Sequence, residues 1–241
     1  MAKFALLDCE IYVAGFDFTG DSNSAQVEME AEALKATTFG SGGWDECIAG
    51  LKTTTLELEG LWEAGAGKVD PEAFSALGGT ETVHMLAPAG TETSIVYGWR
   101  AARFKYSLGG EVGQIAPFAL TSQGSGADGA VRGQLAKAKG SVSATGQLGS
   151  VLNLGAPTGA QFVYAGLHVF SVGTTITVQV QSDDNSGFTT ATTRATLGPI
   201  TATGGTWLTK VAGPFSGETH WRLNVSAVTG TFLAAGWIAV Q

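Results

Sequence analysis

The chain has 241 residues, of which 35 are glycine and only 14% are charged, a composition typical of short strands joined by many turns. Its 21 acidic side chains outnumber the 13 basic ones, and the net charge of −8 argues against a dedicated nucleic-acid clamp, because phosphate contacts need a basic face. No apolar run approaches the ~20 residues of a membrane span, and the apolar stretch before Asp8 is too brief for a secretion signal, so we expect no membrane partner and synthesis in the cytoplasm.

Strands are predicted first along the chain. Residues 10–18 predict a strand or hairpin, and two longer segments after it alternate with period two. In residues 26–33 and again in residues 55–59, apolar side chains fall on one parity and acidic or polar ones on the other, which is typical of strands buried on one face. The glycine-rich link at 40–43 permits a sharp reversal between them. The acidic side chains, called the five glutamates below, are Glu28, Glu30, Glu32, Glu57 and Glu59.

One flanking helix is predicted from Asp70 to Leu77. Asp70 is a favourable N-cap residue, and Gly78 stands where the helix should end. Phe74 and Leu77 are three residues apart, so we expect them to form the apolar stripe that packs on the rest of the protein.

A concentrated basic patch follows in a predicted strand that includes residues 99–106. Its basic side chains are Arg100, Arg103 and Lys105, and the last two share one parity of the strand. A basic strand with interleaved aromatic residues can bind single-stranded nucleic acid. Because the surrounding charge is negative, contact with an acidic surface on a neighbouring subunit fits better. We therefore take these three residues as candidate inter-subunit contacts.

The second half of the chain changes in character. Residues 140–159 are rich in glycine, serine and threonine and nearly free of charge, so they predict a linker. Short strands separated by turns follow it, with the spacing of a small antiparallel sandwich. The last of them, residues 232–240, is apolar on both parities and should lie centrally. These patterns predict one domain over residues 1–150 and a C-terminal β-sandwich over residues 151–241.

Several stretches of the first half together resemble the tail tube (major tail) proteins of long-tailed bacteriophages. These stretches are Asp17–Ser24, Ala33–Gly40, Gly43–Trp44, Gly50–Lys52 and Leu56–Trp62, with a looser match at Gly113–Phe118 and Val131–Gly133. The resemblance implies a mainly β fold in which a pair of packed antiparallel sheets with one flanking helix forms the tube domain. It also implies hexameric rings that close a β-barrel around a lumen and stack into a tube.

The same resemblance implies the partners and the location. The chain would contact further copies of itself and other tail proteins such as the tape measure and terminator proteins, and it would be located in the tail of the virion. DNA would pass through the lumen without specific binding. Carboxylates on the wall would repel phosphates, so that the polyanion slides. The five glutamates are therefore candidate lumen-facing residues, although a plain solvated sheet face gives the same pattern.

No pattern typical of catalysis or cofactor binding emerges. Residues 124–129 match the spacing of a dinucleotide-binding loop, but the residues after them predict a strand rather than the required helix. The three histidines are scattered and lack a partner motif. Glu57 and Glu59 are two apart on one strand, with nothing to raise the pKa of either. We therefore expect no enzyme, no cofactor and no metal site.

Two other classes of protein fit the composition. One is another virion structural protein, such as a head decoration or baseplate component. The other is a carbohydrate-binding module, because Trp207 and Trp221 are aromatic residues of the kind that stack on sugars when exposed.

Overall fold

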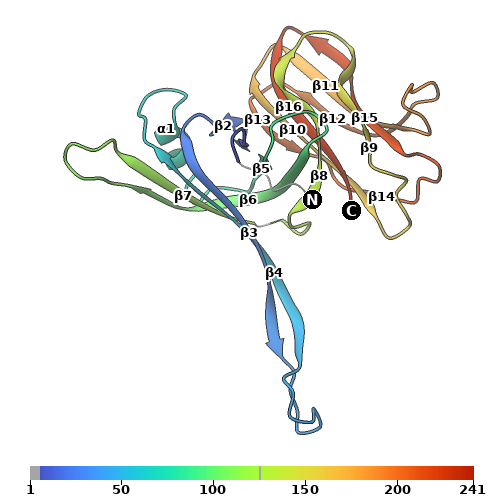
Figure 1. The fold of residues 1–241 in the computed structure, drawn as a ribbon. Coiled ribbons are helices and arrows are strands. Elements are labelled where there is room, and N and C mark those ends of the chain that lie inside the picture. The colour runs from blue at the N-terminus through green and yellow to red at the C-terminus, as the bar shows by residue number, and fades with distance from the viewer. Residues whose placement is uncertain (1–5, 125) are drawn as a thin grey trace. The chain divides into compact units, whose positions relative to one another are not determined.

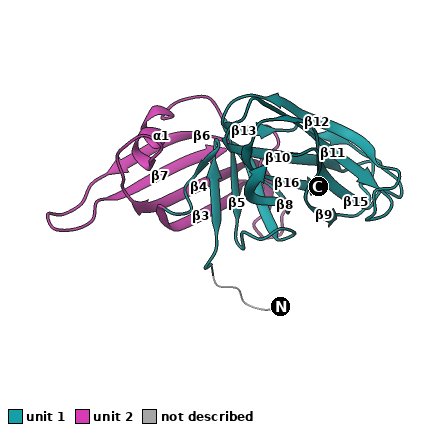
Figure 2. Ribbon diagram, turned by 90° about the horizontal axis from the view of Figure 1, so that it is seen from above, with its two compact units in different colours: residues 1–20, 82–100, 131–241 teal, residues 21–81, 101–130 magenta. Residues whose placement is uncertain are grey.

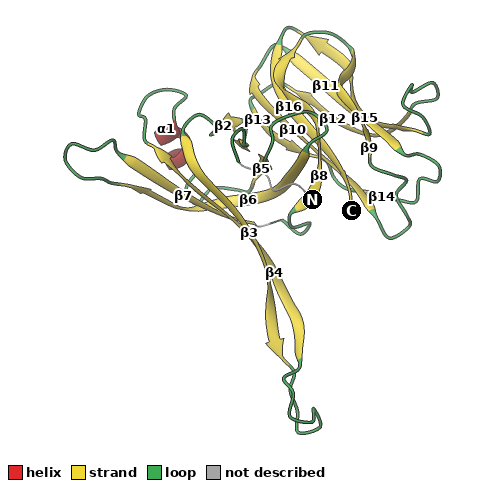
Figure 3. Cartoon of the chain, in the orientation of Figure 1, coloured by secondary structure: helices red, strands yellow, loops and turns green. Residues whose placement is uncertain are grey.

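The structure, a computed structural model, describes residues 6–124 and 126–241, and within these ranges it is built of antiparallel strands with a single short helix (Figure 3). The mainly β fold with one flanking helix is thus confirmed. The chain forms two compact units (Figure 2). Unit 1 comprises the segment up to Gly20, Thr82–Arg100 and Val131–Gln241, and unit 2 comprises Asp21–Glu81 and Ala101–Ala130.

Unit 1 contains two sheets (Figure 1). One sheet has the strand order β13-β10-β16-β8-β6-β5-β1-β2, with β14 beside β10, and the other has the order β12-β11-β15-β9. The strands are β1 (Glu10–Val13), β2 (Phe16–Asp17), β5 (Thr82–Ala87), the first part of β6 (Ile95–Leu108), β8 (Val131–Val142), β9 (Gly146–Asn153), β10 (Phe162–Ser171), β11 (Thr175–Asp183), β12 (Thr192–Ile200), β13 (Gly204–Trp207), β14 (Val211–Ala212), β15 (His220–Thr229) and β16 (Phe232–Val240).

The last strand, β16, contributes side chains to two hydrophobic cores of unit 1. Phe232 and Ile238 point from one face of β16 into a core shared with the four-stranded sheet. Trp237 points from the other face into a second core, to which Tyr12 and Met85 also belong. The prediction that this strand lies centrally is confirmed, since β16 pairs with β8 on one side and β10 on the other.

Trp237 fits its core because β6 and β10 each carry a glycine against its indole ring. A Cβ atom on Gly98 would lie 2.2 Å from Cζ2 of Trp237, and one on Gly166 would lie 2.5 Å from its Nε1. Real Cβ atoms do not approach so closely, so a side chain at either position would force the indole to move.

Residues 140–159, the predicted linker, are largely strand instead. They contain the end of β8 and all of β9, which pairs with β15 and buries Leu148 and Leu152. Gly149 has φ +73°, and a Cβ there would lie 2.1 Å from the carbonyl oxygen of Ala136. Glycine serves here for close packing of two backbones rather than for flexibility. The expected boundary near residue 150 falls inside β9, and the compact units do not follow the division into 1–150 and 151–241.

Unit 2 is a four-stranded antiparallel sheet with the helix on one face. Its strand order is β3-β4-β7-β6, given by the pairing of β3 (Ser22–Lys35) with β4 (Cys47–Leu61), of β4 with β7 (Pro117–Gly124) and of β7 with the later part of β6. Leu56, Leu58 and Leu120 are buried on the face that carries α1 (Val69–Ser75).

The helix buries a different stripe from the predicted one. Val69 and Ala73 are fully buried, whereas Phe74 is 70% exposed and Leu77 lies beyond the end of the helix. Asp70 does not cap the helix; its carboxylate accepts hydrogen bonds from Trp62 Nε1 at 3.1 Å and from the Tyr106 hydroxyl at 2.8 Å. These bonds tie the first turn of the helix to Trp62, which directly follows β4, and to Tyr106 on β6, and this orientation turns Phe74 toward solvent.

Candidate assembly surfaces

Four of the five glutamates share one exposed face of unit 2, opposite the face that carries α1. In the register of β3 and β4, Glu28 faces Thr55, Glu30 faces Thr53, Gln26 faces Glu57 and Ser24 faces Glu59. Within these two described strands each carboxylate thus stands opposite a neutral polar side chain. The register avoids the repulsion of directly facing carboxylates while keeping all four on one surface.

Glu32 lies beyond a β-bulge in the same hairpin. Ala31 pairs with Lys52 but Ala33 pairs with Ala49, so β4 has one residue more than β3 at this point. A Cβ on Gly50 would lie 3.0 Å from Oε2 of Glu32, so the carboxylate folds over the glycine. All five glutamates are exposed on one hairpin, as expected for a solvated or lumen-facing surface.

The three basic candidates do not form one patch. Arg103 pairs with Ser122 and Lys105 pairs with Thr121, which leaves Phe104 as an extra residue in a bulge. The prediction that Arg103 and Lys105 share a face is therefore wrong: Lys105 lies exposed on the glutamate face, and Arg103 lies under the helix.

Arg103 is buried within its own chain. Its side chain is 2% exposed and its guanidinium donates a hydrogen bond to the carbonyl of Glu72 on α1. Burial lowers the pKa of Arg103, and the nearby Glu72 carboxylate opposes this effect. The guanidinium carbon of Arg100, in unit 1, lies 6.0 Å from the centroid of the Trp207 ring. Of the three, Lys105 is the residue that the structure leaves exposed to a neighbour.

The outer half of the β3–β4 hairpin extends beyond the rest of unit 2 (Figure 1). β4 pairs with β7 over Thr55–Leu61, and within the described chain the residues of β4 before Thr55 pair with β3 alone. Apolar side chains on this ribbon are exposed, among them Leu51 at 79% and Ile48 at 60%. Isolated two-stranded ribbons are marginal in water, so this exposed apolar ribbon is a candidate contact surface.

The loop at the end of this ribbon, residues 36–46, is called the tip loop below. It is held by short-range hydrogen bonds, including Glu46 N to Thr37 Oγ1 at 3.0 Å and Thr38 N to Ser41 Oγ at 3.0 Å. Phe39 is fully exposed and Trp44 is 80% exposed. Sequence reasoning read this stretch as a glycine-rich reversal and missed its aromatic residues, although two large aromatics inside a polar turn are themselves a signal of a contact surface.

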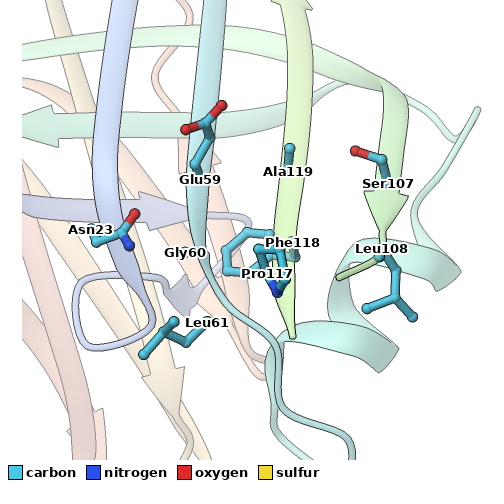
Figure 4. A pocket seen from close by; sticks show the side chains of 10 residues that line it. Asn23, Glu59, Gly60, Leu61, Ser107, Leu108, Pro117, Phe118 and Ala119 are labelled. Carbon is cyan, nitrogen blue, oxygen red and sulfur yellow. The ribbon is translucent and has the colours of Figure 1, made fainter. Parts of the chain in front are cut away.

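The opposite end of the same strands carries a shallow pocket, called the end pocket below (Figure 4). It has a volume of about 440 Å³ and lies where β4 and β6 end and β3 and β7 begin. Its apolar side chains are those of Leu61, Leu108, Pro117, Phe118 and Ala119, and its polar ones are those of Asn23, Glu59 and Ser107. The sequence showed no sign of this pocket, because it depends on the register of four strands.

The aromatic residues that suggested carbohydrate binding are packed inside unit 1. Trp221 is fully buried and its Nε1 donates to the carbonyl of Gly155 at 3.1 Å. Trp207 is half-buried and meets Trp237 edge to face at 5.2 Å. Trp221 therefore cannot stack on a sugar, which removes half of the pair on which that interpretation depended.

The histidines also lie in packed surroundings. His84 and His168 are fully buried in unit 1, and His220 is half-buried. Burial, with a smaller contribution from His84, lowers the pKa of His168 to about 3. Over the described ranges, no group of three or more His, Cys, Asp or Glu side chains could hold a metal ion. The single described helix is too short to span a membrane.

No family model and no curated protein matches the chain. Among solved structures it is similar to a chain of the virion of a native gene transfer agent particle, with 16% identity and a TM-score of 0.44, over 52% of this chain and 96% of that one. A chain from the tail of an empty gene transfer agent particle, determined with C6 symmetry, gives 17% identity and a TM-score of 0.42 over the same shares. The SPP1 Dit (gp 19.1) protein is described as a hub of the adsorption apparatus in phages that infect Gram-positive bacteria. It is similar with 11% identity and a TM-score of 0.40, over 97% of this chain and 99% of that one.

Proposed function

We propose that this chain is a structural, non-enzymatic protein of a phage-type tail and that it polymerises as stacked hexameric rings to form the tail tube. The observation that carries the proposal is the outer half of the β3–β4 hairpin. Its apolar side chains and its two tip aromatics are exposed in the single chain. Leaving them in water costs ~25 cal/mol per Å² of apolar surface. Repeated contacts with further copies would bury them.

The acidic face of unit 2 supports the role of the tube as a conduit. Glu28, Glu30, Glu57 and Glu59 lie on one surface, and a ring of subunits would repeat these charges around the lumen. DNA would pass along such a wall without being held, because phosphates meet like charge. The partners then follow from the sequence resemblance: other copies of the chain, a tape measure protein and a terminator protein, in the tail of a virion assembled in the host cytoplasm.

Electron microscopy of the purified full-length protein tests this proposal. We expect long hollow cylinders with a regular axial repeat, because stacked identical rings extend without limit. Closed single rings that never stack would indicate a baseplate component instead, and flat lattices or caps would indicate a head decoration protein. A protein that stays monomeric at every concentration and salt condition tried would contradict the proposal.

A further inference from the structure

The two ends of the unit 2 sheet carry complementary features. β3 runs from the end pocket to the tip loop, and β4 runs back from the tip loop to the pocket. The 15 residues of β4 span about 45 Å at ~3.3 Å per residue. A projecting aromatic loop and an apolar hollow therefore stand at opposite ends of the same strands.

We infer that the tip loop of one copy of this chain docks into the end pocket of a second copy, with Phe39 and Trp44 as the inserted side chains. The inference rests on the proposed function and deepens it, because it names the contact that joins successive copies. Leu61 and Leu108 are about half exposed in the pocket, so they offer apolar surface that the fold does not itself cover.

The chemistry of the two surfaces matches. Pro117 is exposed beside the two leucines and offers apolar surface to the face of an aromatic ring, whereas Phe118 is buried and forms the floor of the pocket. At the rim, the Glu59 carboxylate and the Asn23 amide oxygen can accept hydrogen bonds. The indole N–H of Trp44 is a donor, and it requires such an acceptor when the ring is buried. In Figure 4, Glu59 and Asn23 are on the neighbouring strands β4 and β3.

The area involved fits a specific contact. Two buried aromatic side chains contribute about 300–500 Å², and Leu34, Ile48 and Leu51 on the adjoining ribbon add further exposed apolar surface. A standard protein interface buries ~800 Å² on each partner. The tip loop and its ribbon thus supply most of what one side of such an interface requires.

The geometry also decides the kind of assembly. The tip loop and the end pocket are different surfaces, so one contact leaves a free pocket on one copy and a free tip on the other. Such a heterologous contact extends into an open filament unless its rotation closes a ring. This is the property that a stack of layers needs.

A photocrosslinking experiment tests the contact in the full-length protein. Benzoylphenylalanine replaces Trp44, and labelled and unlabelled protein are mixed so that mass spectrometry separates crosslinks between copies from those within one. We expect crosslinks from position 44 to residues 59–61 and 107–119 of a second copy. The double variant Leu61→Ser, Leu108→Ser should reduce them by about tenfold or more, because burial of two leucines is lost. Both leucines are partly exposed, so this variant should fold.

The matched control places the photocrosslinker at Phe74, an exposed aromatic on α1 of the same unit, from which no crosslink to the pocket is expected. Tubes whose position 44 crosslinks elsewhere, or to no other copy, would overturn the inference and leave the proposed function standing. Crosslinks to the pocket in oligomers that form no hollow tube would support the inference and overturn the tube.

Discussion

The bulge at Phe104 places the side chains of Arg103 and Lys105 on opposite faces of the sheet. The Arg103 guanidinium is buried against the Glu72 carbonyl, and Lys105 is exposed. We expect Arg103→Gln to lower the free energy of unfolding by about 1.5–3 kcal/mol, because a charged hydrogen bond to a buried carbonyl is lost. Lys105→Gln should change it by no more than about 0.5 kcal/mol. Urea unfolding of both variants measures the difference, and equal effects would show that Arg103 does not anchor the helix.

His168 makes the stability of unit 1 dependent on pH. It lies fully buried beside Tyr12, Phe170 and His84, and neither of its ring nitrogens has a hydrogen-bond partner within the described residues. Its pKa is about 3 in the folded protein, against ~6.5 in the unfolded chain. The folded state therefore prefers the neutral ring. The stability that this provides is complete above about pH 6.5 and is lost as the pH falls toward 3.

The variant His168→Phe tests this dependence. It keeps an aromatic ring in the site but cannot take up a proton. Between pH 6.5 and 4, the free energy of unfolding of the variant should therefore fall less steeply than that of the wild type, and the two slopes should differ by up to about 1.4 kcal/mol per pH unit. His220→Gln serves as the control, because this side chain is half-buried at the end of β15. Parallel slopes for the wild type and His168→Phe would mean that acid acts on the protein through other groups.

Along the strands, the alternation of apolar and polar residues could be read from the sequence, but the pairing register of neighbouring strands could not. The period-two pattern of β4 and the apolar character of β16 predicted which faces are buried, because side-chain burial follows residue type wherever a face is covered. The prediction for β3 was wrong: Met29, Ala31 and Ala33 on its apolar parity are exposed, because the outer half of the hairpin pairs with no third strand in the described chain. The bulges at Phe104 and beside Gly50 each add one residue without a signal in composition, and each changes which side chains share a face. The end pocket depends on the same register, so it could not be predicted either.

Glycine accounts for the other errors at this level. In β9 a glycine allows two backbones to touch, and in residues 36–46 glycines help to form an ordered loop that displays two aromatics. Both stretches have the composition of flexible segments. Distinguishing them from true linkers requires knowledge of what lies within a few ångströms, which sequence alone lacks.

The glutamate face leads to a prediction about the whole hairpin. Replacement of Glu28, Glu30, Glu32, Glu57 and Glu59 by Gln should alter the free energy of unfolding by no more than about 0.5 kcal/mol for each exposed position. Tubes should form as before, because the register already keeps the carboxylates apart and the amide oxygen introduced by Glu59→Gln can still accept a hydrogen bond at the rim of the end pocket. DNA release from particles built with this variant should become slower or less complete if the face lines the lumen. Glu111→Gln, an exposed loop position, is the control for charge alone. Release at the wild-type rate would argue that the glutamates face elsewhere.

At the level of the whole molecule, neither compact unit is a continuous piece of chain. Unit 1 combines β1, β5 and β6 with strands that follow residue 130, and β6 continues into unit 2. Removing residues 160–241 would take away β10, β11, β15 and β16 and expose the cores that they share with β8 and β9. The C-terminal half is thus an integral part of the fold rather than a detachable accessory.

The length of the β3–β4 hairpin has a consequence for the dimensions of the assembly. If each tip loop enters the next copy's end pocket, the hairpin acts as a ruler, and the number of residues in its strands is translated into the spacing between layers. Duplicating Ala33–Leu34 in β3 together with their facing partners Ile48–Ala49 in β4 would lengthen the ruler by about 6.6 Å and keep every side chain on its face.

The axial repeat of the tubes, measured by electron microscopy, should grow by up to the same amount. Deleting Gly65–Ala66, in the loop before α1, should leave the repeat unchanged. An axial repeat that stays the same with the longer hairpin would mean that another part of the subunit sets the spacing between layers. A repeat that follows it would mean that the pitch of the tube, and with it the length of tail built from a given number of subunits, is encoded in two strands of one hairpin.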